Sequence, residues 1–187
     1  MNANILFTLA LLMFPATLNA QSKNSQTFEK FICDGNFFAA MIPSGWDKQE
    51  EILLGRQEKQ YGVDLTYTNP KTRNIAFPSI SLIYFGPDHL RFKTPAEYIG
   101  ASLQTRKKIK DETATAPRHS TFNGRKAQVF EKITYSSIPK MALMFEKHVV
   151  MPAKKGFFVL SFQAPNDAAK DYLKIFDKVI ASFKPNI

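Results

Sequence analysis

Few residues in this chain could perform chemistry, and most of them stand far apart in the sequence. The three histidines are His89, His119 and His148, of which the first is expected to pair with Asp88 at the surface. Glu146 lies two residues before His148 in a segment with the alternating pattern of a strand, so their side chains should share one face. Together they would supply two metal ligands, whereas zinc usually takes about three or four from the protein. We therefore expect an exposed or hydrogen-bonded His148, and a metal or cleft site is the alternative.

Common catalytic signatures are missing from the sequence. It contains no nucleophile elbow, no paired-cysteine motif, no zinc-protease motif and no glycine-rich phosphate or dinucleotide loop. The single cysteine, Cys33, stands among apolar neighbours, which predicts a buried and unreactive thiol. We therefore expect a protein that binds rather than catalyses and that needs no cofactor, with an exported enzyme as the alternative.

Positive charge is the most distinctive property of the composition. Lys and Arg number 25 against 16 Asp and Glu, which gives a formal net charge of +9. A basic surface attracts acidic proteins and anionic lipid headgroups, so an acidic protein or an anionic envelope component is the expected partner. Nucleic acid is not expected, because no aromatic residues are interleaved with the basic run.

The candidate binding residues are a basic run and three cations that follow it: Arg106, Lys107, Lys108 and Lys110, and then Arg118, Arg125 and Lys126. They make one patch only if the segment after the run folds back beside it. Further lysines follow at Lys147, Lys154 and Lys155. The alternative is that these cations only make the surface soluble.

The first 20 residues have the pattern of an export signal. They contain no charged side chain, and an apolar run over residues 5–18 ends at Leu18-Asn19-Ala20. The run is shorter than the roughly 20 residues that cross a bilayer, and a small residue at its end is typical of a signal-peptidase site. We predict a cleavable signal peptide over 1–20 and a periplasmic or secreted mature protein that is not integral to the membrane. An uncleaved anchor and a buried first helix are the alternatives.

The mature chain should place its polar residues on a sheet. A turn-like Asp34-Gly35-Asn36 between two apolar runs predicts a hairpin of residues 28–32 and 37–43. Residues 110–124 are predicted to be a long loop or an irregular edge strand. The segment 157–162 is almost wholly apolar, as is typical of a central strand covered on both faces. Alternating patterns predict further strands over 63–67, 127–135 and 141–151, and residues 80–85 are predicted to form another that is closed by Gly86-Pro87-Asp88.

Two helices have clear signals. Thr94-Pro95-Ala96-Glu97 predicts a capped helix start, and this helix is expected to run to about Lys107. The second helix is expected to begin at Pro165-Asn166-Asp167 and to bury one face against the sheet, since apolar residues recur there at helical spacing: Ala169, Tyr172, Leu173, Phe176, Val179, Ile180 and Phe183. With no repeat or linker in the sequence, residues 21–187 are predicted to form a single α+β domain.

Three segments of the chain carry a resemblance to a known family: residues 38–46, which end in Pro43-Ser44-Gly45-Trp46, residues 94–98, and residues 156–162 with the helix that follows them. These segments and the order of the elements resemble the PsbP-like family, which includes the photosystem II extrinsic protein, DcrB-like periplasmic proteins and Mog-type Ran-binding proteins. The resemblance implies a central antiparallel sheet flanked by helices in an α-β-α sandwich. It also implies a non-enzymatic binding or assembly role. A chaperone-like protein with an apolar groove also fits this fold.

Overall fold

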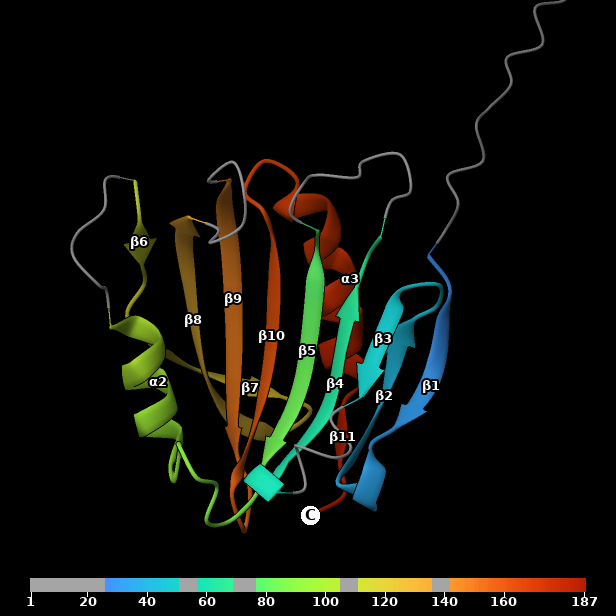
Figure 1. The fold of residues 1–187 in the computed structure, drawn as a ribbon, viewed down its shortest axis with the longest axis vertical. Helices are drawn as coiled ribbons and strands as arrows, with labels where there is room; N and C mark the ends of the chain where they lie inside the picture. Colours follow the sequence, from blue (N-terminus) through green and yellow to red (C-terminus); the bar gives the residue numbers. More distant parts are fainter. Residues whose placement is uncertain (1–25, 51–56, 69–76, 105–110, 136–141) are drawn as a thin grey trace, which may run out of the picture.

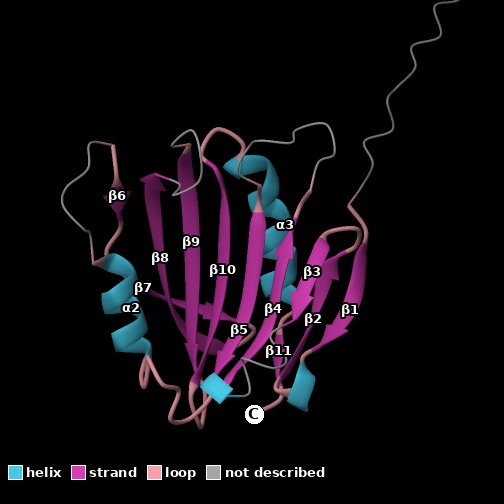
Figure 2. Ribbon diagram, viewed as in Figure 1, coloured by secondary structure: helices cyan, strands magenta, loops and turns pink. Residues whose placement is uncertain are grey.

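The computed structural model describes residues 26–50, 57–68, 77–104, 111–135 and 142–187. They form a large antiparallel sheet, a small antiparallel sheet and the helices α2 (Pro95–Leu103) and α3 (Ala169–Ser182) (Figure 1, Figure 2). The large sheet has the strand order β3-β4-β5-β10-β9-β8-β6, and β7 also pairs with β8. The predicted signal peptide and the run Arg106–Lys110 lie outside the described residues.

The strands follow the expected order with two additions. The small sheet consists of β1 (Phe28–Ile32), β2 (Phe38–Pro43) and β11 (Lys184–Pro185), and a short 3-10 turn links the first two. The large sheet consists of β3 (Asp47–Glu50), β4 (Gln60–Thr66), β5 (Ser79–Phe85), β6 (Thr113–Ala114), β7 (Arg118–Phe122), β8 (Arg125–Tyr135), β9 (Leu143–Pro152) and β10 (Phe157–Pro165). The sequence patterns did not predict β3 and β11.

The central position of β10 is confirmed. It pairs with β5 on one side and with β9 on the other, and Phe157 to Leu160 are buried. Successive side chains of a strand point to opposite faces, so Phe158 and Leu160 join the core under α3 while Phe157 and Val159 join the one under α2. The two helices therefore cover opposite faces of the large sheet, and α3 lies behind it in Figure 1.

Helix α3 buries the face that its spacing predicts. Phe176 is fully buried and its ring stacks on Phe162 of β10, with 5.6 Å between the ring centroids. Its carboxyl end is fixed by Asn123, whose side-chain amide donates to the carbonyl oxygens of Ala181 and Phe183 at 3.1 and 3.2 Å. The helix begins at Ala169, four residues later than the predicted Pro165, because a hydrogen-bonded turn occupies the residues between them.

Helix α2 is shorter than its sequence predicts. Its start is capped as expected, with Thr94 Oγ1 accepting from the Glu97 amide at 3.2 Å. The helix ends at Leu103 instead of continuing to about Lys107, and Gln104 has an extended backbone. Leu103 is the last residue of the helix that packs against the apolar cluster on this face of the sheet. No apolar residue follows until Ile109, so packing would not support further turns.

Candidate functional site

The face of the large sheet that carries α2 changes from apolar to polar along its strands. Under the helix, Ile83, Val159 and Val150 lie side by side on β5, β10 and β9. Two residues further along each strand, the same face carries polar side chains instead. Strand register places these in two adjacent rows: Ser81, Ser161 and His148 in one, and Ser79, Gln163, Glu146 and Lys132 in the other.

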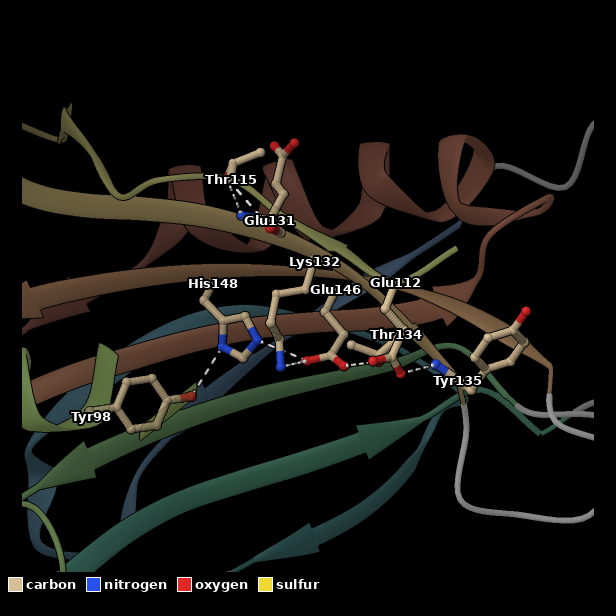
Figure 3. A network of polar contacts seen from close by, with 9 residues as sticks. All are labelled: Tyr98, Glu112, Thr115, Glu131, Lys132, Thr134, Tyr135, Glu146 and His148. Carbon is tan, nitrogen blue, oxygen red and sulfur yellow. Dashed lines mark hydrogen bonds and ion pairs between the residues drawn. The ribbon is translucent and has the colours of Figure 1, made fainter. Parts of the chain in front are cut away.

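A chain of polar contacts begins where these rows meet α2 (Figure 3). The Tyr98 hydroxyl of α2 lies 3.0 Å from Nδ1 of His148, and Nε2 of His148 lies 3.1 Å from Oε2 of Glu146. Glu146 also pairs with Nζ of Lys132 at 3.0 Å and accepts from Oγ1 of Thr134 at 2.8 Å. The prediction that Glu146 and His148 share a face is confirmed. We call these five residues the polar network.

The charges of the polar network follow from its hydrogen bonds. Burial alone would raise the pKa of Glu146, but the hydrogen bond from His148 and the nearby Lys132 outweigh it and lower that pKa to about 2. Burial lowers the pKa of His148, and Glu146 opposes this only in part. Burial also raises the pKa of Tyr98 to about 12. At neutral pH the network therefore contains a carboxylate, a neutral imidazole and a protonated phenol.

The neutral imidazole uses both of its nitrogens inside the polar network. A carboxylate can only accept, so Nε2 of His148 donates to Glu146 and Nδ1 accepts from the Tyr98 hydroxyl. The ring is 7% exposed and stacks on Phe130, with 4.6 Å between centroids. Within the described parts of the chain, no three His, Cys, Asp or Glu residues are grouped so that they could hold a metal ion. The arrangement ties α2 to the sheet and offers His148 no free nitrogen for a ligand.

Further polar contacts hold the edge of the sheet beyond the network. Figure 3 also shows Glu112 accepting from the Tyr135 amide at 3.1 Å and Thr115 accepting from the Glu131 amide at 2.9 Å. Both link the segment around β6 to the backbone of β8. They position an edge strand and bring no further titratable group to His148.

A pocket of about 610 Å³ opens at the end of the sheet where β4 begins and β5 ends. This is the lower end in Figure 1, beside the label of the carboxyl terminus. Its lining comes from well-separated segments, and three aromatic and three lysine residues characterise it: Phe37, Tyr61, Tyr84, Lys59, Lys154 and Lys155. We call it the lysine pocket.

The aromatic residues form one packed group. Phe37 contacts both Tyr61 and Tyr84, with centroid distances of 4.5 and 4.7 Å. Tyr84 is 2% exposed, whereas Phe37 and Tyr61 are half-buried. The Tyr84 hydroxyl donates to the carbonyl oxygen of Lys155 at 2.6 Å and so fixes the turn between β9 and β10 to the aromatic group.

Two lysines of the pocket carry charge without a described counter-ion. Lys59 lies 4.0 Å from Asp88, a long contact between two exposed groups. Lys154 and Lys155 are exposed and form no ion pair with any described residue. The described residues that line the pocket include no acidic side chain. Ile187, the last residue of the sequence, also lines the pocket, so three lysines stand against one main-chain carboxylate and the balance of charge favours an anion.

The predicted basic patch is described only in part. Arg106, Lys107, Lys108 and Lys110 lie outside the described residues. Arg118, Arg125 and Lys126 lie on the exposed β7–β8 hairpin, where Arg118 pairs with Glu131 at 3.4 Å. Arg125 and Lys126 are successive strand residues and so point to opposite faces. That these three cations form one patch with the basic run stays a prediction.

His89 does not pair with Asp88 at the surface. It is 3% exposed, and its Nδ1 accepts from the amides of Arg91 and Phe92 at 3.2 and 3.0 Å. Its ring lies against Phe85, with 4.7 Å between centroids. The turn sequence before His89 indicated exposure, and only the packing of aromatic rings around that turn buries it. Asp88 lies near Lys59 instead.

Cys33 is buried, as its apolar neighbours in the sequence predict. Cys33 is 2% exposed, and burial, together with the nearby Asp34 and Glu50, raises the pKa of its thiol to about 12. Such a thiol is protonated and unreactive at neutral pH. Trp46 is buried between Tyr67 and Tyr172, beside the edge strand β3. Neither residue has the exposure that a reactive or ligand-binding group needs.

The sequence matches no family model and no curated protein. Solved structures do match. PA94 of Pseudomonas aeruginosa, a protein of unknown function and putative regulator, is 10% identical with a TM-score of 0.50, and the match covers 86% of this chain and 98% of that one. Cyanobacterial PsbP (CyanoP) of Synechocystis sp. PCC 6803 is 15% identical with a TM-score of 0.49, over 88% of this chain and 95% of that one. The Saccharomyces cerevisiae Ran-binding protein Mog1p is 8% identical with a TM-score of 0.49, over 86% and 96%.

The fold is PsbP-like. The resemblance found in the sequence is confirmed as a likeness of fold, and so is the α+β class with a central antiparallel sheet between helices. At these identities the likeness concerns the fold alone. No helix in the described residues is long and apolar enough to cross a membrane.

Proposed function

We propose that the protein is an exported, non-enzymatic binding module that holds an anionic group of an acidic protein or of an envelope component at the lysine pocket. One observation carries this proposal. Lys154 and Lys155 line the pocket and are exposed, and they have no ion pair with a described residue. Ammonium groups that line one pocket repel each other, so a bound anion offsets that repulsion as well as adding its own attraction.

The polar network supports the non-enzymatic part of the proposal. The Glu146 carboxylate contacts His148, Lys132 and Thr134, all of which belong to the network. Both ring nitrogens of His148 are engaged by Tyr98 and Glu146. A general base must have a free lone pair within reach of the substrate. The lone pair on Nδ1 of His148 already accepts from Tyr98, which favours a structural role.

The export part of the proposal is supported by the sequence of residues 1–20. Their uncharged, apolar character and the small Ala20 at their end are typical of a cleaved signal. Removing them takes away no charged residue, so the mature chain keeps the net charge of +9. A partner outside the cytoplasm would therefore meet a strongly basic molecule.

Charge reversal at the pocket tests the proposal. The variant is Lys154→Glu/Lys155→Glu, and the matched control is Lys170→Glu/Lys174→Glu on the exposed side of α3. Both variants change the net charge equally. Association with immobilised poly-L-glutamate, a mimic of an acidic protein surface, is measured by biolayer interferometry at low and physiological salt. Vesicles of phosphatidylglycerol, compared with phosphatidylcholine, represent an anionic envelope component.

We expect the pocket variant to associate at least about tenfold more slowly than the parent, and the control variant to slow by no more than about twofold, because local charge governs the encounter rate. The difference should shrink as salt rises, since exposed charges are screened over about 8 Å near 0.15 M. Equal losses in both variants would mean that only the net charge matters. An unchanged rate for the pocket variant would overturn the proposal.

A further inference from the structure

We infer that the lysine pocket binds one small ligand that joins an oxyanion, such as a carboxylate, sulfonate or phosphate, to a planar aromatic body. This inference rests on the proposed function for the anion site at the lysines, and it goes beyond that function in placing a small aromatic molecule in the pocket. Three properties of the pocket lead to it: its size, its aromatic side and its lysines.

The size of the pocket fits a small molecule. About 610 Å³ lies inside the range of roughly 300–1,000 Å³ that is usual for small-molecule sites. Such sites are mostly apolar and contain a few polar groups that fix the orientation of the ligand. The lysine pocket has this composition, with an aromatic group on one side and lysines beside it.

The aromatic side of the pocket can receive a flat ring. Phe37 and Tyr61 are half-buried, so part of each ring faces the pocket, while the buried Tyr84 supports them from the core. Aromatic rings prefer offset or edge-on contact with another ring. Phe37 is held in place because the backbone of Asn186, which also lines the pocket, donates to its carbonyl oxygen at 2.9 Å.

The lysines are attached to a fixed backbone beside that group. The Tyr84 hydroxyl holds the carbonyl oxygen of Lys155, and the Gly86 amide donates to the carbonyl oxygen of Lys59 at 2.8 Å. Gly156 has φ +76° and closes the turn after the lysines, where a Cβ would collide with the carbonyl oxygen of Phe85. The positions of the lysine backbones are thus set before a ligand arrives, which lowers the cost of ordering on binding.

Other classes of occupant fit less well. A cation would meet lysines and no acidic side chain among the described lining residues. A neutral apolar molecule would leave Lys154 and Lys155 without a counter-ion. A simple inorganic anion would use the lysines and leave the faces of Phe37 and Tyr61 in contact with water.

A matched pair of fluorescent probes separates these possibilities. 8-Anilinonaphthalene-1-sulfonate carries one sulfonate, and N-phenyl-1-naphthylamine has the same rings without it. We expect saturable one-to-one binding of the sulfonate probe to the purified protein, at least about tenfold tighter than binding of the neutral probe. The backbone amide NMR signals of Gly86 and Gly156 should shift when the sulfonate probe binds.

Two pocket variants assign the contributions of charge and ring. Lys154→Gln/Lys155→Gln should weaken the sulfonate probe at least about fivefold and leave the neutral probe within about twofold. Tyr61→Leu keeps an apolar side chain but removes the flat ring, so it should weaken both probes. Lys170→Gln/Lys174→Gln is the control and should change neither. Circular dichroism melts verify that each variant is folded before its affinity is compared.

The outcomes distinguish this inference from the proposed function. If methanesulfonate, which carries the sulfonate without a ring, competes as strongly as the larger probe binds, or Tyr61→Leu changes nothing, the lysines hold an anion but the aromatic part of the inference is wrong. If Lys154→Gln/Lys155→Gln leaves the sulfonate probe unaffected, the anion site itself is wrong and the proposed function fails with it. Shifts at the exposed Ile32 and Met41 instead of the pocket glycines would place the probe on unrelated apolar surface and overturn the inference.

Discussion

His148 depends on its neighbours for its hydrogen bonds and its charge state. Its two nitrogens face groups of opposite character, a carboxylate that only accepts and a phenol that donates, and this asymmetry fixes one neutral tautomer. Glu146 in turn receives three donors, and its side chain and that of Lys132 are each only 16% exposed. Because partly buried charges are costly when they lose their partner, the polar network should be most sensitive at Glu146.

The first prediction concerns Glu146→Gln and pH. Near pH 7 the change leaves Lys132 without its carboxylate and should lower the free energy of unfolding by about 2–4 kcal/mol. The pKa of Glu146 is about 2 when folded and 4.5 in its ordinary state. Its ionisation therefore stabilises the fold fully above about pH 4.5, and this contribution is lost as pH falls from 4.5 towards 2. His148, whose pKa is lowered, adds stability that is lost as pH falls below its ordinary 6.5.

Urea unfolding of the parent and of Glu146→Gln across pH 2 to 8 measures this effect. The gap between the two free energies should be widest near neutral pH and should narrow below about pH 4.5, since the parent alone must protonate Glu146. Thr134→Val, which removes one neutral donor from the same carboxylate, serves as a milder comparison. A gap that stays constant down to pH 2 would contradict the lowered pKa of Glu146.

At the scale of elements, the periodicity of apolar residues predicted the buried face of a helix better than local signals predicted where a helix begins or ends. The apolar spacing of α3 identified its buried face because a helix repeats every 3.6 residues whatever surrounds it. The predicted start of α3 was wrong because a hydrogen-bonded turn precedes the helix. The predicted end of α2 near Lys107 was wrong because the packing of the helix against the sheet ends at Leu103. The two-residue strand β11 carries too few residues to show any period, and it forms only because β2 lies beside it.

The lysine pocket could not be predicted by the same means. Phe37, Tyr84 and Lys155 come from three separate segments, and nothing in the sequence near any one of them indicates the others. The sequence identifies Lys154 and Lys155 only as positive charges. Their position beside an aromatic group depends on how β5, β9 and β10 meet. By contrast, the contact of Glu146 with His148 was predictable, because it depends only on alternation within one strand.

A second prediction belongs to helix α3. Phe176→Ala should reduce the free energy of unfolding by about 3–5 kcal/mol, because a large ring leaves a cavity between the helix and Phe162. That would be a large part of the roughly 5–15 kcal/mol that is usual for a domain. Lys174→Ala, on the exposed side of the same helix, should change the stability by less than about 0.5 kcal/mol. A loss below about 1 kcal/mol for Phe176→Ala in urea unfolding would mean that α3 does not carry the core as described.

At the scale of the whole molecule, the two faces and one end of the large sheet have different roles. Helix α3 and the small sheet bury one face, so that face is committed to stability. Helix α2 covers an apolar part of the other face, and the polar network fastens it there. The end of the sheet that carries the lysine pocket combines exposed lysines on turns and strand ends with an aromatic side, and Tyr84 joins that side to the core under α3.

The last prediction concerns the processing of the whole chain. If residues 1–20 are a cleaved signal, protein recovered from its native host should begin at Gln21, and intact mass should equal that of residues 21–187. Replacing Ala20 with a bulky residue, as in Ala20→Phe, should block cleavage, because signal peptidase requires a small residue at that position. The uncleaved variant should then remain with the membrane fraction, whereas the parent appears in the soluble export fraction. Recovery of a soluble parent protein that retains Met1 would contradict the export signal. Because residues 1–20 carry no charged side chain, cleaved and uncleaved protein would have the same side-chain charge, and the lysine pocket would be equally basic in both.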